Sequence, residues 1–126
     1  MNLHCVQGII NLAENGPEDG GLMVLKGSRH HYRELFEEVF KKDEPENGWT
    51  KVDIHRFSDD QIKWLESRPG AEWHKVCAKP GDLLLWDSRT CHYGAPPMSS
   101  NSRIAACEHI LCVGSGYGLI SRRRLL

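Results

Sequence analysis

Short apolar runs closed by glycine- and proline-bearing turns occupy both ends of this chain and restrict the folds open to it. Residues 3–12 are rich in apolar and β-branched side chains and end in the turn at 14–17, and residues 22–25 form a second run. These features predict two strands joined as a β-hairpin with a long turn. The same pattern returns late in the chain, at residues 72–77, 83–86 and 103–113.

The middle of the chain changes to helical spacing. Apolar side chains at 32, 35, 36, 39 and 40 predict an amphipathic helix with Ser28 as its N-cap. Ser58, followed three positions later by Gln61, has the form of a capping box and predicts a short helix that ends at 68–70. Counting a weaker strand at 51–54, about six strands surround two helices. This order favours a mainly β, antiparallel fold, because the strand–helix alternation of a parallel sheet is missing.

Length and composition exclude several classes of function. The chain has 126 residues, enough for one domain or a piece of one. Its formal net charge of −1 gives no general attraction to nucleic acid, and no apolar run approaches the ~18–20 residues that span a bilayer. Five cysteines, an odd number, and a start without a signal sequence predict a reduced protein of the cytoplasm.

Residues 80–97 are the most informative segment. A tight turn begins an apolar strand, and the strand delivers His92 into a bend rich in glycine and proline. Arg103 follows at the start of the next strand. An imidazole can bind a metal, and an arginine can hold a carboxylate through two contacts. A structural histidine and a surface arginine are the plainer alternatives, and spacing alone does not decide between them.

Two separated motifs resemble the phytanoyl-CoA dioxygenase family. Residues 81–94 are similar to the family's distal-histidine segment. Residues 6–12 and 17–30 are similar to its central hairpin, in which an acidic-Gly-Gly turn leads into a strand that ends in Gly-Ser-His. Here Arg29 stands between the serine and the histidine. The resemblance covers residues 3–108.

The resemblance implies a fold, a chemistry and two site residues. The fold is a partial double-stranded β-helix (a jelly-roll or cupin-like barrel) over residues 1–113, with two accessory helices and an atypical tail at 114–126. The implied cofactors are Fe(II) and 2-oxoglutarate, and the implied reaction is hydroxylation of a small or lipid-like substrate. His92 would be the distal iron ligand, and Arg103 would bind the remote carboxylate of 2-oxoglutarate.

The family's other two iron ligands form a His-x-Asp pair upstream of residues 3–12. None of the seven histidines of this chain is followed two positions later by an acidic residue. Asp53-x-His55 and Glu72-x-His74 have the reverse order, and we expect exposed polar strand faces there. The expectation is a truncated or catalytically inactive member of the family.

Two other functions remain open from the sequence. One is a non-catalytic jelly-roll module that binds a small molecule through Arg103. The less favoured one is a zinc-binding domain, because the spacing of the candidate ligands lacks a Cys-x2-Cys knuckle; these ligands are Cys91, His92, Cys107, His109 and Cys112. Open sheet edges in a partial barrel would also favour self-association.

Overall fold

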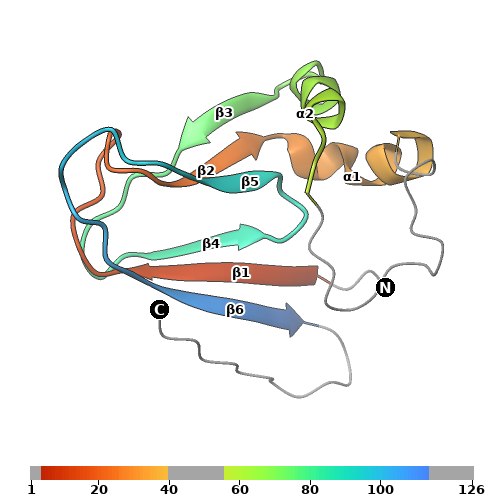
Figure 1. Ribbon diagram of the computed structural model, residues 1–126. Helices are drawn as coiled ribbons and strands as arrows, with labels where there is room; N and C mark the ends of the chain where they lie inside the picture. Colours follow the sequence, from red (N-terminus) through yellow and green to blue (C-terminus); the bar gives the residue numbers. More distant parts are fainter. Residues whose placement is uncertain (1–3, 40–55, 114–126) are drawn as a thin grey trace.

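The computed structural model describes residues 4–39 and 56–113, with side chains described for all of these except 4–5 and 107–113. The described part is mainly β (Figure 1). Its strands are β1 (His4–Asn11), β2 (Gly21–Lys26), β3 (Glu72–Lys75), β4 (Leu83–Asp87), β5 (His92–Ala95) and β6 (Ala105–Val113). The helical segments are η1 (Ser28–His31), α1 (Tyr32–Glu34), η2 (Leu35–Val39) and α2 (Asp59–Glu66).

The strands form two antiparallel sheets of three strands each, in the orders β4-β1-β6 and β3-β2-β5. Figure 1 shows the sheets as two layers, with the helical segments beside β2 and β3. The predicted hairpin of β1 and β2 is wrong, because these strands are the middle strands of different sheets. The loop between β1 and β2 is attached to the segment between β3 and β4. The backbone of Asn15 pairs there with that of Ala78 through hydrogen bonds of 2.9 and 3.0 Å.

Alternation along β1 defines an inner and an outer face of its sheet. Ile9 and Asn11 are buried, whereas Ile10 and Leu12 between and after them are exposed. Successive side chains of a strand point to opposite faces. Ile9 and Asn11 therefore face the sheet β3-β2-β5, and Ile10 and Leu12 face away from it.

The first helical segment differs from the prediction. It begins as a 3-10 turn, continues as one α-helical turn and ends as a π-helix, η2. Ser28 is not its N-cap: Gly27, with φ at +78°, stands there. The Ser28 hydroxyl instead donates to the Leu25 carbonyl at 2.7 Å and accepts from the Cys91 backbone N–H at 2.9 Å. Leu25 lies on β2 and Cys91 directly precedes β5, so this hydroxyl joins β2 to the start of β5.

The second helix confirms its prediction. The Ser58 hydroxyl accepts from the Gln61 backbone N–H at 3.4 Å, and the Gln61 side chain accepts from the Ser58 backbone N–H at 2.8 Å. This reciprocal pair is the capping box. The helix ends at Glu66, shortly before Pro69.

A small hydrophobic core lies between the helices and the sheet β3-β2-β5. Its buried members are Leu25, Leu35, Leu65 and Cys91. Val24, the neighbour of Leu25 on β2, pairs with His92. Because neighbouring side chains alternate, Leu25 and His92 face opposite sides of the sheet. The helices therefore cover one face of this sheet, and the other face is left for the sheet that contains β1.

Several predicted features lie outside the described residues. They are the strand at 51–54, the Asp53-x-His55 pair, the last apolar position of the first helix and the tail at 114–126. Within the two described ranges, no helix is long and apolar enough to cross a membrane.

Candidate functional site

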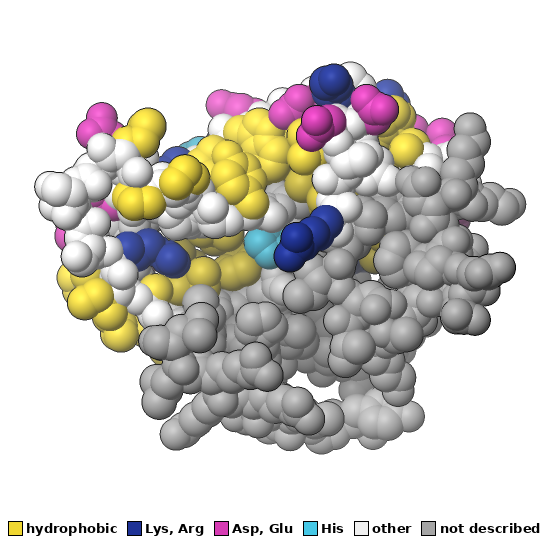
Figure 2. Space-filling view, in the orientation of Figure 1, with side chains coloured by type: hydrophobic (Ala, Val, Ile, Leu, Met, Phe, Trp, Pro, Cys, Tyr) yellow, Lys and Arg dark blue, Asp and Glu magenta, His cyan; other side chains and the backbone are white. Residues whose placement is uncertain are grey.

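A cavity of about 250 Å³ lies between the two sheets and holds both residues singled out from the sequence. Figure 2 shows a hollow between the layers, with hydrophobic side chains along it and a histidine and basic side chains near it. Residues of both sheets and of the segment before β6 line it: Gln7, Gly8, Ile9, Gly21, Leu22, Trp86, His92, Tyr93, Gly94 and Arg103. His92 and Arg103 thus come from different elements to one cavity.

His92 begins a strand rather than lying in a bend. The β4–β5 turn is closed by a hydrogen bond of 2.9 Å from the Thr90 N–H to the Asp87 carbonyl. His92 then enters β5 and pairs with Val24 of β2. The sequence placed this histidine in a bend because glycine and proline follow it closely. β5 instead continues to Ala95, just before Pro96.

One ring nitrogen of His92 is already occupied. Its Nδ1 lies 2.7 Å from the Thr90 carbonyl oxygen. A carbonyl only accepts, so Nδ1 carries the hydrogen and Nε2 of the neutral ring keeps its lone pair. Trp86 packs against the ring edge-on, with centroids 5.2 Å apart. A fixed tautomer held by a backbone carbonyl is the usual arrangement of a histidine that binds a metal.

The nearest acidic side chain in sequence, Asp87, is used for structure. Its carboxylate accepts from the Arg89 guanidinium at 2.9 and 2.6 Å and from the Arg89 backbone N–H at 3.0 Å. Arg29 adds a contact of 3.4 Å. The hydrogen bonds from Arg89, and the nearby positive charges, hold the pKa of Asp87 well below its usual range. This ion pair shapes the turn before His92.

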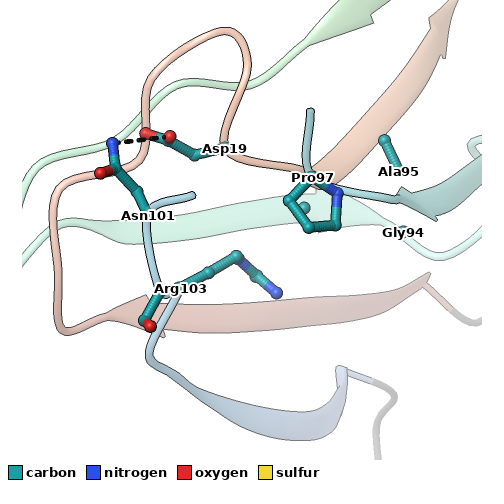
Figure 3. Close-up of a pocket in the computed structure, with 8 residues that line it drawn as sticks. Asp19, Gly94, Ala95, Pro97, Asn101 and Arg103 are labelled. Atoms are coloured by element: carbon teal, nitrogen blue, oxygen red, sulfur yellow. Dashed lines mark hydrogen bonds between the residues drawn. The ribbon is translucent and has the colours of Figure 1, made fainter. Parts of the chain in front are cut away.

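Arg103 lies at the junction of two cavities. It lines the cavity of His92 and also a neighbouring one of about 460 Å³. Figure 3 shows its side chain extending from the segment before β6 into the space near Gly94 and Pro97. Within the described part of the chain, its guanidinium has no hydrogen bond or ion pair. Arg103 also helps to lower the pKa of Lys75, for which burial is the larger cause. A positive charge without an acidic partner in a cavity favours an anionic ligand.

Two further polar groups in the cavity were missed from the sequence. The side-chain oxygen of Gln7 and the indole N–H of Trp86 are buried and have no hydrogen-bond partner among the described residues. Both residues line the cavity. Buried polar groups are nearly always hydrogen-bonded, so these two indicate a polar ligand or water between the sheets. A lone glutamine within an apolar strand was the available signal for Gln7.

The described side chains do not fit a complete iron site. Non-haem iron(II) in such enzymes is held by two histidines and one carboxylate. His92 supplies one ligand, and the described residues contain no group of three His, Cys, Asp or Glu side chains able to hold a metal. Glu72 and His74 are exposed, as expected, and Glu72 pairs with Lys26 at 3.2 Å.

The zinc alternative is weakened at Cys91. This thiol lies in the hydrophobic core, on the face of the sheet opposite to His92. Burial, with a smaller contribution from Glu66, raises the pKa of Cys91 to about 11. A cysteine that binds zinc must be a thiolate, which this setting disfavours. The side chains of Cys107, His109 and Cys112 lie outside the described part.

Comparisons with known proteins agree with the motifs. The family model described as phytanoyl-CoA dioxygenase matches residues 2–105. A protein of Aspergillus versicolor called "Ava biosynthesis cluster protein O" is 47% identical over 92 residues, which are 72% of this chain and 30% of that protein. The chain thus spans less than a third of this relative's length. No solved structure matches. The matched residues 2–105 form most of the chain, which therefore belongs to the phytanoyl-CoA dioxygenase family.

Proposed function

We propose that this chain binds a short 2-oxo dicarboxylate, 2-oxoglutarate in the first place, between its two sheets. The observation that carries the proposal is the Arg103 guanidinium, unpaired within the described chain, on the same cavity as the free nitrogen of His92. An arginine holds a carboxylate through two parallel hydrogen bonds, which orient the ligand as well as attract it. The family to which the chain belongs uses this cosubstrate.

The other lining residues suit such a ligand. The indole N–H of Trp86 can donate to a ligand oxygen, and the Gln7 side chain can donate through its amide or accept through its oxygen. Nothing lies within 4 Å of where a Cβ on Gly94 would stand, which leaves space beside His92. Ile9 and Leu22 supply apolar walls. A cavity of about 250 Å³ is small, which favours a compact ligand.

We propose His92 as one ligand of the family's iron centre, and we expect no oxidative turnover by this 126-residue chain on its own. Iron, when bound, supplies oxygen activation for hydroxylation. The support for lack of turnover is the sequence, in which no histidine is followed two positions later by an acidic residue. The proposed fold is a partial double-stranded β-helix over residues 1–113, followed by a tail at 114–126. Its support is the pair of facing three-stranded sheets.

Ligand binding tests the main proposal. We expect saturable 2-oxoglutarate binding in titration calorimetry or in NMR titration of the full chain. Arg103→Gln should weaken it by about tenfold or more, the range for loss of a hydrogen bond to a charged group. Arg33→Gln is the matched control, because Arg33 is exposed and, among the described residues, its ion pair is with Glu37 four positions along the chain. Equal affinity in wild type and Arg103→Gln would overturn the proposal.

Turnover is tested separately. With Fe(II), oxygen and 2-oxoglutarate, we expect no succinate above a protein-free blank. Succinate formation that disappears in His92→Ala would show that this chain completes the iron site, and it would refute the expected inactivity.

The second candidate function is a binding module that uses the same cavity without any metal. The observation that favours it is the single histidine among the described lining residues. Metal dependence separates the two. If His92 binds metal, Mn²⁺ should strengthen 2-oxoglutarate binding in wild type and not in His92→Ala; a metal-independent affinity identifies the module.

We further propose that the hydroxylation implied by the family acts on a small or lipid-like substrate. The name of the relative, a biosynthesis cluster protein, is compatible with a small-molecule substrate. The odd number of cysteines, with Cys77 and Cys91 free in the described part, supports a reducing intracellular compartment.

A further inference from the structure

The turn that enters β2, Asp19-Gly20-Gly21, lies beside Arg103, and Gly21 also lines the cavity. We propose that Asp19 and Gly21 are positioning residues for Arg103: together they hold its guanidinium at the carboxylate-binding position. This inference rests on the proposed function for the nature of the ligand, and on geometry alone for the position of the arginine.

Asp19 holds the segment that leads to Arg103 through hydrogen bonds. Its side chain is only 6% exposed. One carboxylate oxygen accepts from the Ser99 hydroxyl at 2.5 Å and from the Asn101 amide at 3.0 Å, the latter drawn in Figure 3. The other accepts from the Gly16 backbone N–H at 2.6 Å. The contacts to residues 99 and 101 bridge some eighty positions of sequence and end two residues before Arg103.

The backbone on either side of Asp19 strengthens this attachment. The Glu18 carbonyl accepts from the backbone N–H groups of Met98 and Ser99 at 2.8 and 3.1 Å. A Cβ on Gly20, where φ is +72°, would stand 2.7 Å from the Ala95 carbonyl oxygen. Only glycine allows the two segments to come this close.

Gly21 is the surface on which the arginine lies. Its φ is +97°, and a Cβ there would stand 2.8 Å from Nε and 3.1 Å from Cδ of Arg103. Any larger residue would push the guanidinium away from its place. Both residues line both cavities, so a displaced guanidinium would leave the position at which the ligand carboxylate is expected.

The hydrogen bonds of Asp19 leave the Arg103 guanidinium available to a ligand. The Asp19 carboxylate accepts from a serine hydroxyl, an asparagine amide and a backbone N–H, and not from Arg103. It therefore fixes the segment before the arginine without neutralising the guanidinium. An arginine that is held in place loses less freedom on binding, so the ligand gains affinity.

The test compares two ligands that differ in the remote carboxylate, 2-oxoglutarate and 2-oxobutanoate. We expect wild type to prefer 2-oxoglutarate by about tenfold or more. Gly21→Ala should lose that preference, because its affinity should fall more for 2-oxoglutarate than for 2-oxobutanoate. Gly81→Ala is the matched control: Gly81 also has positive φ, +92°, but a Cβ there would meet nothing within 4 Å. It should keep the preference.

A second readout needs no ligand. The NMR signal of the Arg103 Nε–H, assigned by its loss in Arg103→Gln, should shift or broaden in Gly21→Ala and in the milder double variant Ser99→Ala/Asn101→Ala. It should be unchanged in Gly81→Ala. An unchanged signal and a retained preference in the first two variants would overturn the inference. If wild type binds no 2-oxoglutarate, the proposed function fails, and the Nε–H signal alone decides the positioning of the arginine.

Discussion

At the scale of single residues, Gly94 decides how much room the cavity has. It follows His92 by two positions on β5, so both face the cavity. A Cβ at this position would have no described atom within 4 Å, so a side chain here would make no packing contact at its Cβ. The open volume beside the histidine is thus a property of one residue.

This gives a graded prediction. Gly94→Ala should have little effect on 2-oxoglutarate binding, whereas Gly94→Leu should fill the space and weaken binding about tenfold or more, since an overfilled site must distort to accept a ligand. Thermal unfolding should show that both variants fold. Undiminished binding in Gly94→Leu would place the ligand elsewhere.

The Asp19 carboxylate gives a prediction on pH. Its hydrogen bonds from Ser99, the Gly16 N–H and Asn101 lower its pKa in the folded state, against the effect of burial. A depressed pKa contributes stability above the unfolded value of ~3.9, and this is lost as pH falls through the folded value. Wild type should therefore exceed Asp19→Asn in stability at pH 7, and the gap should shrink below about pH 4.

Urea unfolding from pH 7 to pH 3 measures this gap. Asp82→Asn is a useful comparison, because Asp82 is exposed and its carboxylate accepts from the Lys79 backbone N–H. A gap between wild type and Asp19→Asn that is constant over the whole range would contradict the prediction.

At the scale of elements, the short helix α2 depends on its first turn. Eight residues are too few for a helix to be stable alone, so its cap and its packing decide whether it forms. Ser58 satisfies one free N–H, and Gln61 satisfies another in return. Leu65 then places the helix against the core.

Ser58→Ala should lower the free energy of unfolding by about 1 kcal/mol, the usual cost of losing such a cap. Ser58→Thr should restore most of it. Ser67→Ala at the other end of the helix is the control, with a smaller expected effect because its hydroxyl is exposed. Urea unfolding measures all three, and equal stability of Ser58→Ala and wild type would show that the cap is unimportant here.

The elements also show which structural features could be predicted from the sequence. The Ser58 cap and most strand positions were predictable because they depend on neighbours in the chain. The pairing of β1 was not, because its loop closes on Ala78 rather than on β2. Ser28 was assigned a local role, whereas one of its partners lies 63 positions away. Asp19 was visible as part of a motif, but no spacing reveals its contact with Ser99.

At the scale of the whole molecule, one face of the sheet β4-β1-β6 stands out. Its outer side chains Ile10, Leu12, Leu83 and Leu85 are 37% to 61% exposed. Leu83 pairs with Ile10 across β4 and β1, so the exposed groups are neighbours. Contiguous apolar surface of this kind favours association.

We propose that the chain self-associates through this face and the open edges of its sheets. Leu83→Lys/Leu85→Lys should reduce the mean mass at about 100 µM toward that of a monomer, since charged side chains on an edge strand oppose pairing. Light scattering after size-exclusion chromatography measures it. Met98→Lys, at an exposed apolar side chain elsewhere on the surface, controls for a general effect of added positive charge. A wild-type chain that is monomeric over this range would refute the proposal.

The composition of the cavity also has a kinetic consequence. Its lining residues come from the two ends of the described chain, from Gln7 on β1 to Arg103 before β6. Contacts between residues so far apart form slowly, because a long loop must close first. The site is complete only when Arg103 has joined the cavity residues of β1 and β2. Binding of a 2-oxo acid should therefore follow the completion of folding, and its onset in a refolding experiment would time the docking of the two sheets.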